Sequence, residues 1–321
     1  MSTAISLTLR ALLRGAADRI RGGALAARYG GLTPPAQALL VAGTPAELAL
    51  LVVPTDADIE AAASDLRFFL AAIEGWSDVD AERLVLSFPS PEVDPYRGPA
   101  PHLEVASARA RTLYALAALR PRAVVASAAA LLPRLPAPDD IARLGVELAP
   151  GVELSPFELA DRLAEGGYTR EEPVDQHGEF SVRGGIVDVF PAGEAQPIRI
   201  EFVGDLVESL RRYDPATQRS VAPLDRALLV PLREPAWTEA AGRPATLADY
   251  VARHRVAVFL SDPAGIEARA TKRLAQVRAS WAEVSARGRA AGAPAPEALF
   301  AEWEAFAPLV ARAVALEELA V

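Results

Sequence analysis

Hydrophobic positions in the first part of the chain follow the spacings of buried strands and amphipathic helices. Leu48–Val53 is an uninterrupted apolar run ended by a proline, which is typical of a strand buried on both faces of a parallel sheet. Thr55 and Asp58 then match a capping box, which predicts that a helix begins there. The apolar residues that follow recur at helical spacing and predict one core-facing stripe, formed by Ile59, Ala62, Leu66, Phe69 and Ile73.

The same alternation extends over the first 126 residues. Thr3–Tyr29 has a helical pattern that ends at Gly30-Gly31, and its expected apolar side holds Leu7, Leu12, Leu13 and Ile20. Further elements are expected as strands at Leu84–Phe88 and Ala123–Ala126 and as a helix at Glu104–Leu119. Strand-helix-strand repetition with right-handed crossovers predicts a parallel sheet with helices on its faces.

The period changes in the middle of the chain. Phe180 and Val182 alternate with Ser181 and Arg183, and Ile186–Phe190 continues as a second strand. Gly184-Gly185 interrupts these strands, as at a bulge or a close backbone approach. A third strand follows, in which Ile198, Ile200 and Phe202 face one way and Arg199 and Glu201 the other, and Gly204-Asp205 indicates a hairpin turn. We therefore expect an antiparallel meander with one polar face and one apolar face.

The two patterns define the expected domains. Ser155-Pro156-Phe157-Glu158 begins a helix that Gly166-Gly167 ends, and the meander then runs to about Pro231. From Thr246 the helix-strand alternation returns, with a strand at Val256–Leu260 and helices at Ala264–Ser280 and Glu297–Leu319. The prediction is an α/β, parallel-sheet domain in two parts, residues 1–140 and 233–321, flanking an inserted antiparallel β-rich α+β domain, residues 141–232.

Composition limits the functions that this fold can have. The 321 residues are 51% hydrophobic and 23% charged, which is enough to build sizeable cores, and the net charge is −9. There is no cysteine, which excludes disulfides, thiolate metal sites and cysteine nucleophiles. No basic footprint for nucleic acid is visible, no apolar run is long enough to span a membrane, and no export signal is evident. The expected location is the cytoplasm, without a membrane partner.

Two strings of residues in the meander resemble a known family. One is Arg183-Gly184-Gly185-Ile186-Val187-Asp188-Val189-Phe190-Pro191, and the other is Pro197–Asp205 followed by Tyr213-Asp214-Pro215. Both are similar to the second domain of UvrB and of bacterial transcription-repair coupling factors. Asp94-Pro95-Tyr96-Arg97-Gly98 and Asp65–Leu70 resemble the coupling factors more than UvrB. The resemblance implies an N-terminal, UvrB-like module without motor activity, whose RNA polymerase and DNA contacts are made through domains absent here.

The first part of UvrB has a nucleotide-binding fold, which the resemblance places in this chain in degenerate (RecA/helicase-like) form. A phosphate loop needs glycine N–H groups, a lysine for the β- and γ-phosphates and a hydroxyl for magnesium. The corresponding segment here is Gly31–Ala38, which includes Thr33. Gln37 and Ala38 stand at the positions of the lysine and of the hydroxyl residue. Pro34 and Pro35 also remove two N–H donors. We therefore expect no cofactor, no ATP binding and no enzymatic activity.

The resemblance further implies that the β-rich domain docks UvrA, the damage-recognition ATPase of nucleotide excision repair. Tyr168-Thr169-Arg170 and Ser181-Val182-Arg183-Gly184 match the two UvrB segments whose arginines form the docking surface. Arg170 and Arg183 are retained, whereas Thr169 and Ser181 replace arginines. The expected docking residues are Arg170 and Arg183, with Tyr168, Phe180 and Ser181 as further candidates.

Other candidate residues have simpler interpretations. His102, His177 and His254 lack partners at metal-ligand spacing, so structural or surface roles are expected. Asp188 is expected to pair with an arginine on the sheet face rather than to act in catalysis, and Asp94 and Arg97 are expected to pair within their loop. Trp237, Trp281 and Trp303 are expected in core or interface packing. Two other functions remain open, which are an autoinhibitory or structural module packing on absent motor domains and an α/β enzyme with an unrecognised site.

Overall fold

The computed structural model describes residues 7–235, 238, 242–288 and 292–318. The chain forms two compact units. The first comprises Met1–Pro101, Leu119–Leu135 and Gly242–Val321, and the second comprises His102–Ala118 and Pro136–Ala241. An α/β unit made from separated segments and a β-rich unit are both present, as the sequence pattern predicts.

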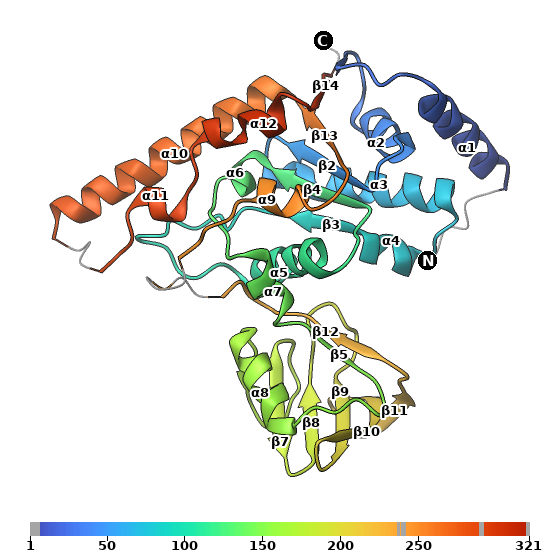
Figure 1. Cartoon of the computed structure of the whole chain (residues 1–321), viewed down its shortest axis with the longest axis vertical. Helices are drawn as coiled ribbons and strands as arrows, with labels where there is room; N and C mark the ends of the chain where they lie inside the picture. Colours follow the sequence, from blue (N-terminus) through green and yellow to red (C-terminus); the bar gives the residue numbers. More distant parts are fainter. Residues whose placement is uncertain (1–6, 236–237, 239–241, 289–291, 319–321) are drawn as a thin grey trace. The chain divides into compact units, whose positions relative to one another are not determined.

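The first unit is built on a sheet of six described parallel strands. From one edge to the other the strands are β1 (Arg28–Tyr29), β14 (Val314–Leu316), β13 (Val256–Ser261), β2 (Leu48–Val53), β4 (Ala123–Ser127) and β3 (Val85–Phe88). All neighbours in this order pair in parallel. Every residue of β2 is buried, because its neighbours pair on both edges and helices cover both faces (Figure 1). The expected buried strand Leu48–Val53 is confirmed.

Helices cover the two faces of this sheet. Side chains from α1 (Leu7–Gly22), α2 (Pro34–Gly43) and α3 (Ile59–Glu74) share one core with Leu51 and Val125 of the sheet. The capping box of Thr55 and Asp58 is formed and leads through a 3-10 turn, η1 (Asp56–Asp58), into α3. The remaining helices of this unit are α4 (Asp78–Leu84), α6 (Ala128–Leu131), α9 (Leu247–Val251), α10 (Pro263–Ala286), α11 (Pro296–Leu299), α12 (Ala307–Val310) and the 3-10 turn η2 (Trp303–Phe306). Figure 1 shows α6 and α10 on the sheet face opposite α1, α2 and α3.

The structure corrects two helical expectations in this unit. The first helix ends at Gly22 rather than near Tyr29, because residues 28 and 29 instead form β1, and Leu7 and Leu12 are exposed rather than packed. The expected helix Glu297–Leu319 is instead two short helices, a 3-10 turn and the strand β14. Pro308 fits only the first turn of a helix, and the apolar residues of β14 gain two parallel neighbours in the sheet.

The second unit contains the expected meander. Its larger sheet has the order β11 (Ser220–Pro223), β10 (Leu206–Tyr213), β9 (Ile198–Val203), β8 (Ile186–Val189), β7 (Glu179–Arg183) and β6 (Thr169–Arg170). The pairs are antiparallel except for β6 with β7. A smaller sheet joins β5 (Val146–Leu148) to β12 (Ala227–Leu229). The described helices of this unit are α5 (Leu103–Ala118), α7 (Pro138–Ala142) and α8 (Pro156–Glu165).

One face of the larger sheet packs on α8. Ser155 caps this helix through its hydroxyl, which accepts from the Phe157 N–H, and Pro156 opens the first turn as expected. Leu159 and Leu163 of α8 enter a core with alternate residues of the strands. The core residues of the strands are Phe180, Val187, Val189, Ile198, Ile200, Phe202, Val207 and Leu210.

The structure shows Gly184-Gly185 to be a two-residue hairpin turn and not a bulge. Arg183 pairs directly with Ile186 across the turn, and the register continues without a shift to Phe180 and Val189. The expected close backbone approach is confirmed, because a Cβ on Gly185 would lie 2.7 Å from the Phe202 carbonyl oxygen. Arg183 therefore shares a face with Ile186, whereas the bulge expectation had separated them.

Candidate protein-docking surface

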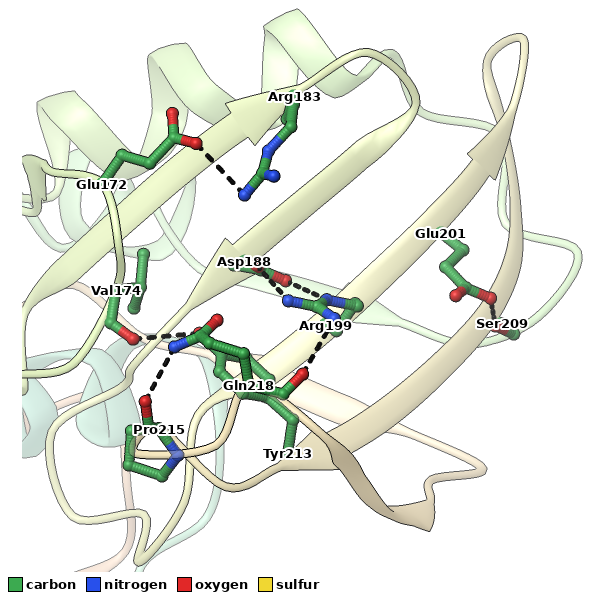
Figure 2. A network of polar contacts seen from close by, with 10 residues as sticks. All are labelled: Glu172, Val174, Arg183, Asp188, Arg199, Glu201, Ser209, Tyr213, Pro215 and Gln218. Carbon is green, nitrogen blue, oxygen red and sulfur yellow. Dashed lines mark hydrogen bonds and ion pairs between the residues drawn. The ribbon is translucent and has the colours of Figure 1, made fainter.

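The turn between β7 and β8 places Arg183 on the face of the sheet opposite the core. The cross-strand pairs Phe180↔Val189 and Val182↔Val187 point to the core, so Ser181↔Asp188 and Arg183↔Ile186 point outward. The Arg183 side chain is 68% exposed, and its guanidinium forms an ion pair of 3.1 Å with Glu172 (Figure 2). It therefore presents a cation at the end of a rigid strand.

Arg170 lies on the neighbouring strand. The two-residue strand β6 pairs in parallel with β7, with Arg170 opposite Phe180. Both β6 residues are exposed, and Arg170 donates from Nη2 to the carbonyl oxygen of Val182 at 3.4 Å. This contact brings the Arg170 guanidinium beside the residue that precedes Arg183. The two expected docking arginines thus gather at one edge of the same sheet.

The other three candidates do not offer their side chains to a partner. Tyr168, Phe180 and Ser181 are only 5%, 3% and 5% exposed. Tyr168 donates its hydroxyl to the Val230 carbonyl oxygen at 3.0 Å, and burial raises the pKa of its phenol. Tyr168 and Phe180 belong to the core of this unit, so they hold the two arginine-bearing strands from beneath. Of the five candidate docking residues, only Arg170 and Arg183 therefore have exposed side chains.

Three apolar side chains that the sequence reasoning did not select lie on the Arg183 face. Ile186 faces outward directly opposite Arg183. Val203 and Leu206 pair with each other at the hairpin that joins β9 to β10. The three residues are 36%, 62% and 46% exposed. The alternation of the strands could have predicted that these three side chains lie on the polar face. It could not predict that they stay exposed, because exposure depends on how the other segments fold. A cation flanked by exposed aliphatic groups is a combination that protein interfaces use.

Below Arg183 the same face carries a rigid ion pair. Arg199 binds Asp188 with two hydrogen bonds, from Nε at 2.7 Å and from Nη2 at 2.8 Å (Figure 2). The hydrogen bonding with Asp188 is the largest cause of the raised pKa of Arg199. The Arg199 guanidinium also lies 4.7 Å from the centre of the Tyr213 ring. Tyr213 in turn donates to the Val174 carbonyl oxygen at 3.2 Å. The expectation that Asp188 pairs with an arginine on the sheet face is confirmed.

The place that corresponds to a phosphate loop has acidic surroundings. Thr33 precedes α2 without a side-chain cap, and Gln37 is buried with its Nε2 3.4 Å from the Leu32 carbonyl oxygen. The adjoining pocket, of about 670 Å³, is lined by Gln37 and apolar residues together with four carboxylates, those of Asp58, Asp262, Glu317 and Glu318. Carboxylates at this position repel phosphate groups, and no lysine lines the pocket. The geometry does not fit a nucleotide.

Other candidate residues fall outside any shared site. His177 donates from Nε2 to the Glu194 carbonyl oxygen at 2.9 Å, and its ring packs at a tilt against Phe190. Asp94 and Arg97 do not pair with each other as expected, because Asp94 accepts from Ser280 and Arg97 pairs with Glu283, both on α10. Trp281 stacks on Tyr96 and Trp303 on Phe306, whereas Trp237 lies outside the described residues.

No group of three or more histidine, aspartate or glutamate side chains among the described residues is arranged to hold a metal ion. Within the same residues, no helix is both apolar enough and long enough to cross a bilayer.

Comparison with known proteins shows which protein family the β-rich unit resembles. The family model of the UvrB interaction domain matches residues 146–234, which include both candidate docking arginines and every strand of the meander. Residues 146–234 are therefore similar to a UvrB interaction domain. It is 37% identical over 102 residues to the UvrABC system protein B of Thermotoga maritima, which is 32% of this chain and 15% of that protein.

The chain is also similar to transcription-repair-coupling factors over a longer stretch. It is 35% identical to that of Myxococcus xanthus over 229 residues, which is 71% of this chain, and 29% identical to that of Escherichia coli over 153 residues, which is 48% of it. It spans only 17% and 13% of the lengths of these two relatives. These matches confirm the resemblance to the N-terminal UvrB-like module of transcription-repair coupling factors.

Proposed function

We propose that this chain recruits UvrA to stalled transcription complexes and that it does so through Arg170 and Arg183. The observation that carries the proposal is the position of both arginines at one edge of the sheet, inside the matched interaction domain. Contacts with RNA polymerase and DNA would belong to parts of a coupling factor that lie beyond this chain. The chain would act in the cytoplasm as a non-catalytic module.

The chemistry of the surface supports a protein partner with carboxylates. Arginine presents a planar fork that binds carboxylates with two hydrogen bonds, and it is more weakly hydrated than lysine. Within the chain, Arg183 already forms an ion pair of 3.1 Å with the carboxylate of Glu172. A partner carboxylate would compete with Glu172, and Ile186, Val203 and Leu206 would supply apolar contact beside the exchanged ion pair.

The central test is Arg183→Ala in a binding titration with purified UvrA. Truncating one member of a charge pair that an interface buries costs about 2–5 kcal/mol, so we expect UvrA binding to weaken by roughly ten-fold or more. Arg170→Ala should weaken it in the same direction and less. The melting temperature should stay nearly unchanged, because an exposed ion pair contributes little to stability.

Two further variants make this test specific. Arg226→Ala is the matched control, because Arg226 lies in the same unit, is 79% exposed and forms an ion pair of 3.4 Å with Glu147. It should bind UvrA like the parent. Glu172→Gln frees Arg183 from its internal competitor and should leave binding unchanged or tighter. The proposal fails if Arg170→Ala and Arg183→Ala both bind like the parent, or if Arg226→Ala weakens binding as much as they do.

A further inference from the structure

A second feature lies in the α/β unit, at the edge of the sheet where the parallel strands begin. Because β2, β13 and β14 are adjacent and parallel, the segments that lead into them meet at one edge. These segments line a hollow of about 760 Å³. Its lining residues are Pro45, Ala46 and Glu47 before β2, His254 and Arg255 before β13, Val256 and Ala257 within it, and Arg312 before β14.

The charges in this hollow are mainly positive. Arg255 and Arg312 are exposed, and among the described residues neither guanidinium has an ion-pair or hydrogen-bond partner. Glu47 is the single carboxylate of the lining, and it is already engaged. Its Oε1 lies 3.4 Å from Nη1 of Arg120 and 3.9 Å from Nδ1 of His254. The two arginines are therefore left without a counter-charge inside the hollow.

This arrangement is unusual for the chain as a whole. The net charge is −9, and the pocket at the opposite ends of β2 and β13 is lined by four carboxylates. Two unpaired guanidinium groups from segments 57 positions apart (255 and 312) are brought to one hollow by the strand order alone. Guanidinium groups bind phosphate oxygens through paired N–H donors.

We propose that this hollow is a binding site for a compact phosphate-bearing anion, held by Arg255 and Arg312. The ligand class is inorganic phosphate, pyrophosphate or a small phosphate ester rather than a nucleic acid. A long polyanion would have to extend from the hollow over the surface of an acidic chain, where counterion release at two arginines gives little affinity. The site is separate from the UvrA-docking surface and does not depend on it.

The test is a titration of the full chain with pyrophosphate, followed by the backbone amide signals of Glu47, His254, Arg255 and Arg312. We expect saturable shifts at these residues that weaken as sodium chloride is added. Removing both charge-assisted donors in Arg255→Ala/Arg312→Ala should weaken binding by about ten-fold or more. Glu47→Gln releases Arg120 and removes the one opposing charge, so it should tighten binding.

The control is Arg269→Ala. Arg269 is exposed on α10, has no ion pair among the described residues and lies outside the hollow, so its removal should leave pyrophosphate binding unchanged. The proposal is overturned if no saturable shift occurs at the hollow, or if the double arginine variant binds pyrophosphate like the parent. It is also overturned if a single-stranded oligonucleotide of ten residues binds the parent more tightly than pyrophosphate does.

Discussion

Arg183 and Arg199 stand on the same face of the same sheet, and each forms an ion pair, yet their surroundings give them different roles. The side chains of Arg183 and Glu172 are 68% and 58% exposed, so water screens their attraction. Those of Arg199 and Asp188 are 19% and 6% exposed, and their two hydrogen bonds hold the carboxylate away from water. Arg183 is thus available to a partner, whereas Arg199 stabilises the sheet that carries it.

This difference predicts unequal effects on stability. Arg199→Ala leaves the Asp188 carboxylate buried without its partner and should lower the free energy of unfolding by about 3 kcal/mol. Arg183→Ala should change it by less than about 1 kcal/mol. Urea denaturation followed by circular dichroism measures both. Replacing both members of the buried pair, in Asp188→Leu/Arg199→Met, should recover part of the loss, and equal destabilisation by the two single variants would contradict this account.

The sequence could predict some of these pairings and not others. The sequence predicts that Asp188 pairs with an arginine on the sheet face, and the register of β8 with β9 identifies that arginine as Arg199. Asp94 and Arg97 look like partners in the sequence, but their actual partners on α10 lie more than 180 residues away and depend on the folded unit. Ser181 is buried although alternation places it on the outer face, where it lies opposite Asp188.

At the scale of elements, the hairpin of β7 and β8 decides where the proposed docking surface lies. Gly184 has a φ of +58° and open space around it, whereas Gly185 lies against β9, and its carbonyl oxygen accepts from the Phe202 N–H at 2.7 Å. A glycine pair inside an alternating pattern fits both a bulge and a turn. Only the pairing of Arg183 with Ile186 distinguishes the two, and pairing is a property of two strands together.

The two glycines should therefore respond differently to substitution. Gly185→Ala places a methyl group 2.7 Å from the Phe202 carbonyl oxygen, which the backbone must move to accommodate. We expect a loss of about 1–3 kcal/mol in the free energy of unfolding and weaker UvrA binding, because Arg183 lies next to the displaced turn. Gly184→Asn should cost about 1 kcal/mol or less, since asparagine tolerates the left-handed region. Thermal unfolding and the UvrA titration test both variants, and a Gly185→Ala protein as stable as the parent would show that the turn yields easily.

At the scale of the whole chain, the α/β unit combines a six-stranded parallel sheet with a pocket lined by four carboxylates. The buried strand β2 and the capped helix after it were predictable, because each depends on local periodicity and capping, whereas the order of the strands was not. The carboxylates of Asp262, Glu317 and Glu318 at this pocket were not predictable either, since these residues follow β13 and β14 and lie far from α2 in sequence. Glu317 and Glu318 directly follow β14, a strand that lies within the segment expected to be a terminal helix.

This pocket predicts that the chain does not bind ATP. Four carboxylates line the pocket beside Gln37, and proline replaces N–H donors at the start of α2. Calorimetric titration with magnesium-ATP should give no measurable heat of binding, and no ATP hydrolysis should be detected. A micromolar dissociation constant assigned to this pocket by loss of binding in Gln37→Ala would contradict the prediction.

The position of β14 between β1 and β13 has a consequence for the order of events during protein synthesis. The strand at residues 28–29 pairs with residues 314–316, so its place in the sheet cannot be filled until nearly three hundred further residues have left the ribosome. All segments of the β-rich unit, by contrast, have emerged by residue 241. We therefore expect the β-rich unit to fold on the nascent chain while the α/β unit still lacks its last strands.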